Sequence, residues 1–374
     1  MIMTDFQIPN PFPWTPLVGP LAAAEDALAR LDERLARSTI KDGWIARTHF
    51  SDAADSLWLA GELVHVEDLV LHDAHMDVRA PTHEVTRAHA ILRARRRVAE
   101  SKPGWALSPI GLGTLRGRSR GIQTRLQGQG GATRNGDDEE DEIDVAEWDP
   151  SGDQDALVEE MAEIDVVLAR SERVLAGNVR QGEKDPLVYD IDWDEDERLA
   201  EWNAAVGSTA EFPPILAAAI ALDAWEAIEP LQHAAWLSQI LTAALLRDRG
   251  KTRAHLFCLN TGLRSIPREK RRASTRERRL VSFIEAIGAA AERGLQDHDR
   301  WLLARRQLER KLVGHRSTSK LPALIELVMS RPVVSAGMIA KELSVTSRAA
   351  QNLVAELGVR ETTGRGRYRA WGVF

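Results

Sequence analysis

Apolar positions in the last part of the chain recur at helical spacing in three short segments. The first segment, 321–330, carries leucines and an isoleucine on one side and ends at an Arg-Pro pair. The second, 336–345, and the third, 348–358, each follow a Ser or Thr that can cap a helix N-terminus, and the third ends at a glycine. The tail, 359–374, places apolar residues on both sides of a Thr-Gly-Arg-Gly turn. The pattern predicts three helices, with a tight turn between the second and third, and then a short β-hairpin.

This order of elements resembles a winged helix-turn-helix, whose third helix enters the major groove of DNA. The third helix turns outward four side chains able to contact phosphates and base edges: Ser347, Arg348, Gln351 and Asn352. The hairpin offers three basic side chains for the DNA backbone or the minor groove: Arg365, Arg367 and Arg369. We therefore predict double-stranded DNA as the partner. Two other interpretations stay open, because winged helices also dock proteins and a basic hairpin is often only a solvated edge.

Upstream, apolar residues at helical spacing predict further helices along most of the chain. An amphipathic helix is expected at 20–38, a helical region at 51–75 and another helix at 156–177. The most apolar part, 212–250, predicts two helices broken near Glu229-Pro230 that lie at the centre of a bundle. Ala, Leu, Arg and Glu are abundant, which favours helices over sheets. We predict an all-α protein, a multi-helix bundle with a C-terminal winged helix-turn-helix that carries a small β-hairpin.

Changes in composition divide the chain into four parts. Residues 1–101 form an N-terminal helical region, 151–316 a central helical bundle and 317–374 the winged helix-turn-helix. Between them, 102–150 is Gly-rich and basic and then acidic, without apolar periodicity, which predicts a disordered linker of mixed charge. The arginines of this segment could instead contact nucleic acid as a flexible arm, although the acidic block beside them disfavours that interpretation.

The net charge of −7 conceals an asymmetry, because Lys and Arg far outnumber acids from residue 247 onward. A basic C-terminal portion behind an acidic front is typical of a nucleic-acid-binding module on a separate scaffold. The single cysteine, Cys258, excludes a disulfide within the chain and a Cys-based zinc site. No apolar run is long enough to span a membrane, so we expect no membrane partner and a cytoplasmic protein.

Two short motifs are similar to motifs of the Fic family. The phrase WEAIEPLQH, from Trp225, is similar to the FEAIHPF phrase that precedes the family's phosphate-binding loop. The segment 56–61 is similar to the family's inhibitory helix, with Ala60 in place of the inhibitory Glu. The resemblance implies a helical core that often carries a C-terminal winged helix, and nucleotidyl transfer at the loop. As a whole the chain looks closest to a bacterial family of uncharacterised proteins known by a helix-turn-helix DNA-binding domain at the C-terminus.

The residues that the Fic family uses for catalysis are replaced here. The position of the catalytic His is Glu229, and the Gly-Asn-Gly that would cradle phosphates falls on 234–236, which is Ala-Ala-Trp. A cradle needs backbone N–H groups free to turn toward an anion, which glycine permits, whereas we expect Ala-Ala-Trp to continue a helix. We therefore predict a Fic-like scaffold that is not an enzyme and uses no cofactor. The enzymatic alternative, a divergent Fic-type nucleotidyl transferase, would use Glu229 or His233.

Three other groups of residues were considered for chemistry. The helical spacing of His65, Asp68 and His72 allows a metal site, but helix-surface histidines usually face water, and we expect none. Glu226 with Glu229 and His233 could form an acid/base set, although no nucleophile lies near them in sequence. The basic block 268–279 could add phosphate contacts. Our prediction is a non-enzymatic DNA-binding protein that regulates transcription. The alternative of a protein-docking scaffold and the question of a homodimer stay open.

Overall fold

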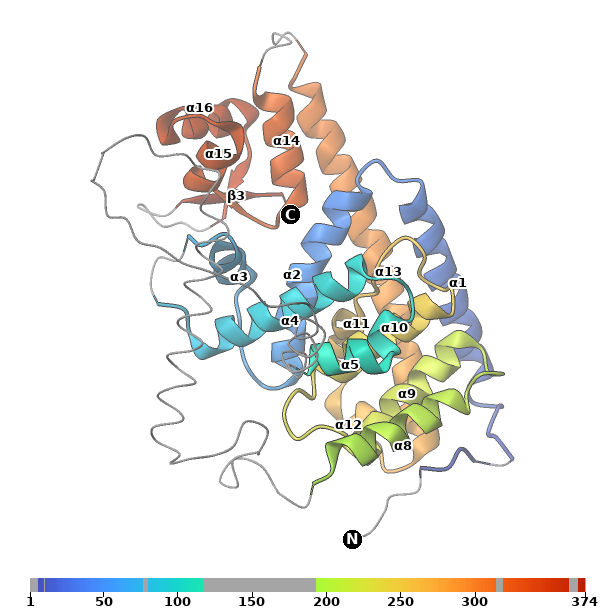
Figure 1. The fold of residues 1–374 in the computed structure, drawn as a ribbon. Helices are drawn as coiled ribbons and strands as arrows, with labels where there is room; N and C mark the ends of the chain where they lie inside the picture. Colours follow the sequence, from blue (N-terminus) through green and yellow to red (C-terminus); the bar gives the residue numbers. More distant parts are fainter. Residues whose placement is uncertain are drawn as a thin grey trace, which may run out of the picture. The chain divides into compact units, whose positions relative to one another are not determined.

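The computed structural model describes residues 6–9, 11–76, 80–116, 193–313, 319–362 and 369–373. Contacts divide the chain into two compact units, and all elements described below belong to the unit formed by 1–119 and 195–374. The helices of the body are α1 (Val18–Ala36), α2 (Lys41–Leu59), α3 (Val66–Asp73), α4 (His83–Glu100), the 3-10 helix η1 (Trp105–Leu107), α5 (Pro109–Leu115), α8 (Glu195–Gly207), α9 (Pro214–Ile228), α10 (Leu237–Asp248), α11 (Leu259–Ser265), α12 (Arg268–Arg271) and α13 (Arg276–Arg310) (Figure 1). The C-terminal elements are α14 (Leu321–Ser330), β1 (Val334–Ser335), α15 (Ala336–Leu343), α16 (Ser347–Leu357), β2 (Arg360–Glu361) and β3 (Ala370–Gly372). The predicted all-α class with one small C-terminal sheet is confirmed.

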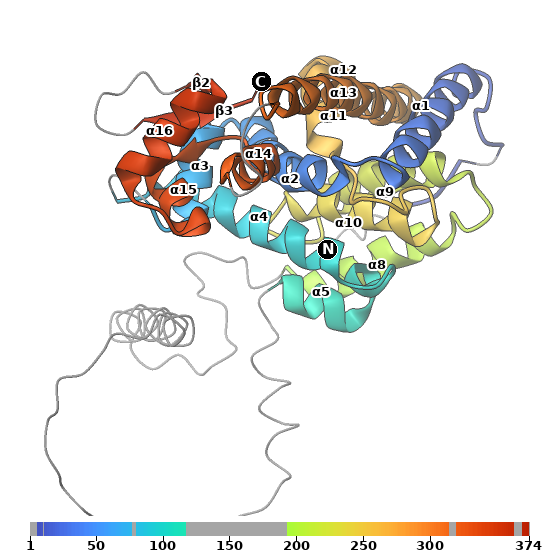
Figure 2. The same cartoon turned by 90° about the horizontal axis from the view of Figure 1, so that it is seen from above.

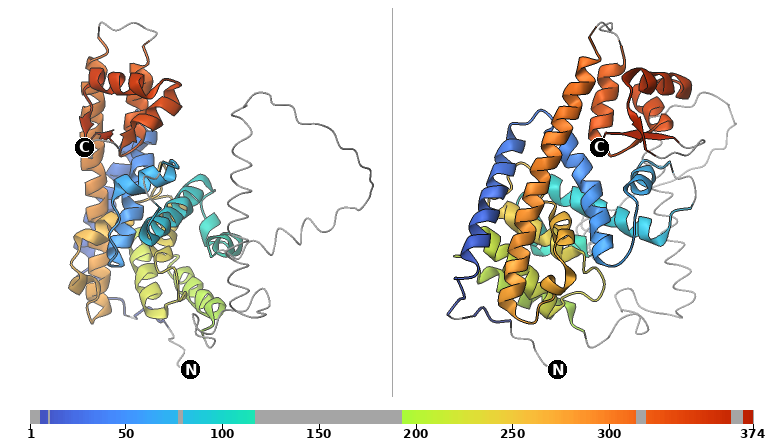
Figure 3. Two further views of the ribbon diagram at one scale, coloured as in Figure 1. Left: turned by 90° about the vertical axis from the view of Figure 1, so that its left-hand side faces the viewer. Right: turned by 180° about the vertical axis from the view of Figure 1, so that it is seen from behind.

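The long helix α13 organises the body. It packs against α1, α9 and α11 and reaches α14 at its C-terminal end (Figure 3). Its 35 residues give it a length of about 50 Å. The contact with α11 is close because Gly262 has no side chain: a Cβ there would lie 2.0 Å from the carbonyl oxygen of Ala286.

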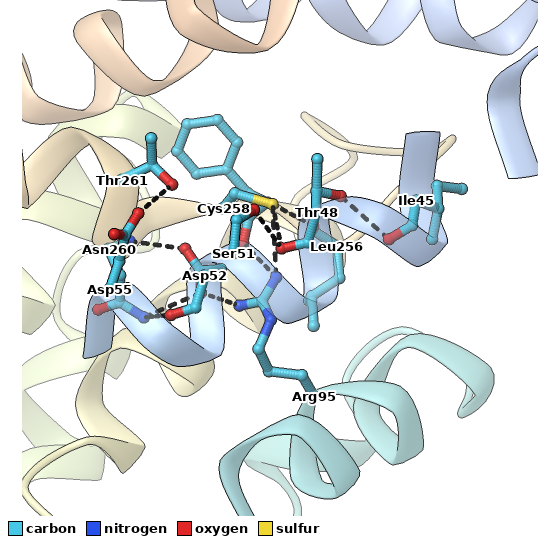
Figure 4. A network of polar contacts seen from close by, with 11 residues as sticks. Ile45, Thr48, Ser51, Asp52, Asp55, Arg95, Leu256, Cys258, Asn260 and Thr261 are labelled. Atoms are coloured by element: carbon cyan, nitrogen blue, oxygen red, sulfur yellow. Dashed lines mark hydrogen bonds and ion pairs between the residues drawn. The ribbon is translucent and has the colours of Figure 1, made fainter. Parts of the chain in front are cut away.

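A buried polar network joins α2, α4 and α11 (Figure 4). Arg95 and Asp52 are both 0% exposed and form an ion pair of 2.5 Å. Asn260 donates to Asp52 from its backbone N–H and its side-chain amide, each at 2.9 Å. One turn further along α2, Asp55 accepts a hydrogen bond from the Thr261 hydroxyl at 2.9 Å. The network fixes the positions of α2, α4 and α11 relative to one another, although these helices are far apart in the sequence.

Two expectations for the body are wrong. The first concerns 234–236, which does not continue a helix. The chain leaves α9 at Glu229, which has φ 49°, and Pro230 has no N–H to extend the helix. Ala234 also has a positive φ of 92°, and α10 begins only at Leu237. An irregular loop therefore separates α9 from α10.

The second concerns the start of the predicted linker. Residues 105–115 form η1 and α5, because Ser108 caps α5 by accepting from Gly111 N–H at 3.1 Å and Leu112 is buried. Arg116, which was considered for a nucleic-acid-binding arm, pairs with Asp196 at 2.8 Å. The rest of the linker prediction, from 117 onward, lies outside the described residues.

Candidate nucleic-acid interface

The C-terminal module begins with α14 and ends with a three-stranded antiparallel sheet. Its strand order is β1-β3-β2, with Val334 opposite Trp371 and Arg360 opposite Gly372. The sheet is small because β1 and β2 have two residues each. All three residues of β3 are buried. One edge of β3 pairs with β1, the strand before α15, and the other edge pairs with β2, the strand after α16 (Figure 1).

The turn between α15 and α16 has three residues, as is typical of a helix-turn-helix. Ser335 caps α15 by accepting from Met338 N–H at 3.2 Å, and Thr346 caps α16 by accepting from Ala349 N–H at 3.2 Å. Between them Ser344 has φ 52°, which lets the chain reverse direction. At the other end of α16, Gly358 has φ 63° and its N–H donates to Val354 at 2.8 Å. Side-chain and backbone caps thus define both ends of α16.

One face of α16 is buried and the opposite face is exposed. Ala350, Val354 and Leu357 are buried against α14 and α15. The four side chains predicted to contact DNA are all exposed: Ser347, Arg348, Gln351 and Asn352. Within the described part of the chain, the guanidinium of Arg348 forms no hydrogen bond or ion pair. The structure therefore brings these four residues together on the outer surface of α16.

The residues predicted on the wing are only partly described. Arg365 and Arg367 lie outside the described residues. Arg369 lies beside Trp371, with its guanidinium 5.5 Å from the ring centre, and it forms an ion pair with Glu361 on β2 at 2.5 Å. A phosphate contact from Arg369 would require this pair to open.

The module is attached to the body through Arg47 of α2. This side chain is 4% exposed, and its guanidinium donates to the carbonyl oxygens of Val328, at 3.0 Å, and of Arg331 and Val373. It also lies 4.6 Å from the centre of the Trp301 ring on α13. Burial, and to a lesser extent the charge of Arg300, lower the pKa of Arg47 to about 10. Arg47 therefore joins α2, the end of α14 and the end of β3.

A second attachment comes from the C-terminal end of α13. Lys311 donates from its ammonium group to the carbonyl oxygen of Leu357, the last residue of α16, at 2.7 Å. Arg305 of α13 forms an ion pair with Glu326 of α14. Figure 2 shows these two helices from above. A cation at a helix C-terminus is also favoured by the helix dipole. The body thus contacts α16 directly at its C-terminal end, whereas the residues predicted to contact DNA lie in its N-terminal half. Pattern analysis of the sequence identified neither Arg47 nor Lys311.

Comparisons with known proteins agree with this geometry. Residues 321–374 match a family model described as "HTH DNA binding domain", so the C-terminal module is a helix-turn-helix DNA-binding domain. Residues 187–313 match a model described as "Protein of unknown function (DUF1612)". The chain is 48% identical over 373 residues to "Uncharacterized protein y4cF" of Sinorhizobium fredii (strain NBRC 101917 / NGR234), with 96% of this chain and 97% of that protein covered. The chain belongs to the family of that protein.

These comparisons leave the Fic-like resemblance a prediction. The segment that carried it, 229–236, is the irregular loop between α9 and α10. Glu226 is exposed near the end of α9, and Glu229 is the residue at which that helix ends.

Of the residues that the sequence offered for a metal site, His72 has a structural partner. The imidazole of His72 lies 4.8 Å from that of His89, which in turn lies 3.2 Å from Asp73. In the described ranges no group of three or more His, Cys, Asp or Glu side chains could hold a metal ion. Across the same residues no helix is both long and apolar enough to cross a membrane.

The basic block 268–279 lies at the start of α13, while the module contacts the other end of that helix (Figure 1). About 50 Å of helix separates them. Two members of the block, Arg276 and Arg279, pair with the buried carboxylate of Asp223 at 2.9 and 2.6 Å. The block is therefore not adjacent to α16, and part of it stabilises the body.

Proposed function

We propose that this protein is a transcription regulator that recognises particular double-stranded DNA sequences through α16 and has no enzymatic activity of its own. The observation that supports the proposal is the exposed face of α16, where Arg348, Gln351 and Asn352 follow one another at helical spacing. Arg can donate two hydrogen bonds to guanine, and Asn or Gln can pair with adenine in the major groove. No acidic side chain lies in the first turn of α16. The proposed setting is the cytoplasm, where the protein acts as a monomer or a homodimer.

The test is a selection from a random duplex library with the full chain at moderate salt. A recurring motif, bound with an affinity that falls steeply as salt rises, is the expected result. The Gln351→Ala and Asn352→Ala variants serve to assign base pairs of that motif to α16. Failure to enrich any sequence at low salt would remove DNA recognition from the proposal.

A second candidate function, a divergent nucleotidyl transferase, has one observation in its favour. The chain leaves helical geometry between Glu229 and Trp236, where the resemblance to the Fic family places an anion-binding loop. The loop contains no glycine. Incubation of the protein with α-³²P-labelled ATP and with each of the other labelled nucleotides tests it. Label transferred to the protein or to an added protein substrate, and lost in a Glu229→Ala/His233→Ala double variant, would favour the enzyme.

A further inference from the structure

A cavity of about 640 Å³ lies in the body, away from the exposed face of α16. Most of its walls come from α2, α11 and the middle of α13. Part of its polar wall is visible in Figure 4, where Asp55 on α2 contacts Thr261 on α11. The volume is that of a typical pocket for a small molecule.

The accessible charges of this cavity are positive. Arg264 pairs with Asp55 at 2.6 Å, and Arg293 pairs with Asp297 at 3.2 Å. The two guanidinium side chains are 50% and 53% exposed, whereas the two carboxylates are 10% and 16% exposed. Both acids are therefore covered, while both guanidinium groups keep N–H donors in reach of a ligand. A guanidinium group pairs well with a carboxylate.

Apolar surface accompanies these charges. Trp58 is 41% exposed and Leu63 is 70% exposed, and both line the cavity. Large exposed apolar side chains that line a cavity together mark ligand-binding surface more often than isolated ones do. The guanidinium of Arg264 lies 4.9 Å from the centre of the Trp58 ring, so the positive and the aromatic surfaces are continuous.

We propose that this cavity binds a small organic acid that carries an aromatic ring. The ring packs against Trp58 and Leu63, and the carboxylate pairs with the guanidinium groups of Arg264 and Arg293. The volume admits one ring system of moderate size and excludes a folded protein partner.

The cavity shares its walls with the attachments of the DNA-binding module. Thr48 lines the cavity and follows Arg47, which holds α14 and β3. On the opposite wall, Asp297 precedes Trp301 by one turn, and the Trp301 ring lies beside the Arg47 guanidinium. A ligand that changes the distance between α2 and α13 therefore changes the contacts of Arg47 with α14 and β3, and with them the position of the module on the body. This second part, that the acid alters DNA affinity, rests on the proposed function.

The binding itself is tested without DNA, by calorimetric titration of the full chain with 1-naphthoate. The neutral 1-naphthalenemethanol and the cationic 1-naphthylmethylamine serve as matched probes of the same shape. We expect one site per chain and an affinity for the acid at least ten times higher than for the alcohol. Equal affinity for acid and alcohol, or no binding of 1-naphthoate, benzoate or indole-3-acetate at millimolar concentration, would overturn the proposal.

Variants locate the site. Arg264→Gln and Arg293→Gln should each weaken 1-naphthoate binding at least tenfold, and Arg293→Gln leaves the pair of Arg264 with Asp55 intact. Arg278→Gln is the control, because Arg278 is an exposed arginine of α13 that does not line the cavity. Thermal unfolding checks that each variant is folded. Unchanged binding in both cavity variants would place the acid elsewhere and refute the assignment.

The DNA readout is separate. With a selected duplex, saturating 1-naphthoate should change DNA affinity at least threefold, and Arg293→Gln should abolish that change. Calorimetric binding with no effect on DNA affinity would refute the coupling and leave the site standing. If no duplex binds at all, the proposed function fails while the calorimetric result still decides whether the site exists.

Discussion

The guanidinium of Arg47, on the second helix, donates a hydrogen bond to the main-chain carbonyl of Val373, 326 residues later in the chain. The same side chain also donates to the carbonyls of Val328 and Arg331. Among the described residues, this buried arginine donates hydrogen bonds to three main-chain carbonyls and forms no ion pair with a carboxylate. Hydrogen bonds, and not charge neutralisation, therefore fix its position. Arg47 thus forms one attachment between the body and the DNA-binding module, and Lys311 and Arg305 at the C-terminal end of α13 form another.

Replacement of Arg47 should loosen that attachment. Arg47→Met leaves three carbonyl oxygens without their donor, and each one that is buried and unsatisfied costs about 1–3 kcal/mol. We expect a lower free energy of unfolding and faster amide hydrogen exchange in α14 and β3 than in α9. Exchange rates that stay equal to those of the parent chain in α14 would contradict this role. The Arg278→Gln variant, at the opposite end of α13, is the control and should unfold like the parent.

Substitutions on α16 should separate specificity from general affinity. Gln351→Ala and Asn352→Ala should relax the preference at one base pair each, by about 1–3 kcal/mol for a bidentate contact. Arg348→Ala is expected to weaken binding and, where the contact is to a phosphate, to lower the salt slope by about one. The measurement is fluorescence anisotropy with the selected duplex and single-base variants at several salt concentrations. Glu342→Gln, on α15 outside that face, is the control. Variants that retain the full base preference would show that another surface reads the DNA.

Lys311 should act on DNA binding through α16 without touching DNA. Lys311→Met removes the donor to the Leu357 carbonyl and the charge at the helix C-terminus. DNA affinity should fall a few fold, with the base preference unchanged, because the exposed face keeps its residues. Lys311→Arg keeps charge and donors and should restore most of the affinity. A change in which base pairs are preferred would mean that Lys311 lies at the interface itself.

The local features of the module could be read from the sequence, whereas its attachment could not. Thr346 caps the start of α16 and Gly358 its end, as their capping chemistry predicts. The apolar periodicity correctly separates the buried face of this helix from its exposed face. Arg47 gives no such signal, because its partners are backbone carbonyls that any residue provides, and they lie 281 to 326 positions away. Tertiary hydrogen bonds to the main chain leave no pattern in a single sequence.

Two errors in the body have a local cause. Helix propensity predicted helix at 234–236, but Ala234 adopts a positive φ and α10 begins only at Leu237, so the break that was predicted at Glu229-Pro230 extends through Trp236. In the Gly-rich stretch, overall composition concealed the Ser108-Pro109 pair, which starts α5. In both places a cap or a break decided the structure, and the average composition of the segment did not.

Two buried histidines should make stability depend on pH. Burial, and then the charges of Arg95 and Arg96, hold the pKa of His49 well below 6.5, and burial lowers that of His255 although Asp32 opposes the shift. Below about pH 6.5 these two histidines therefore bind protons in the unfolded chain but stay neutral in the folded chain. The contribution of the two histidines to the free energy of unfolding is fully present above about pH 6.5. It decreases as the pH falls below that value, by up to about 1.4 kcal/mol per pH unit for each histidine.

Urea unfolding at pH 7.5, 6.5 and 5.5 measures this dependence. His49→Gln should flatten the slope between pH 6.5 and 5.5, because one of the two protonations is removed. His83→Gln, at an exposed position, should leave the slope as it is in the parent. A slope that persists unchanged in the His49 variant would assign the pH dependence to other groups.

The ion pair of Arg95 with Asp52 should show strong coupling. Both side chains are 0% exposed, so removing one partner leaves the other charge buried without compensation. Asp52→Asn and Arg95→Met should each cost about 3–5 kcal/mol in the free energy of unfolding. The double variant should be less destabilised than the sum of the single ones, because it retains neither uncompensated charge, and the difference is the coupling energy. Chemical unfolding of the four proteins measures it. Additive losses would mean that the packing of α2, α4 and α11 around the pair, and not the pair itself, stabilises this part of the body.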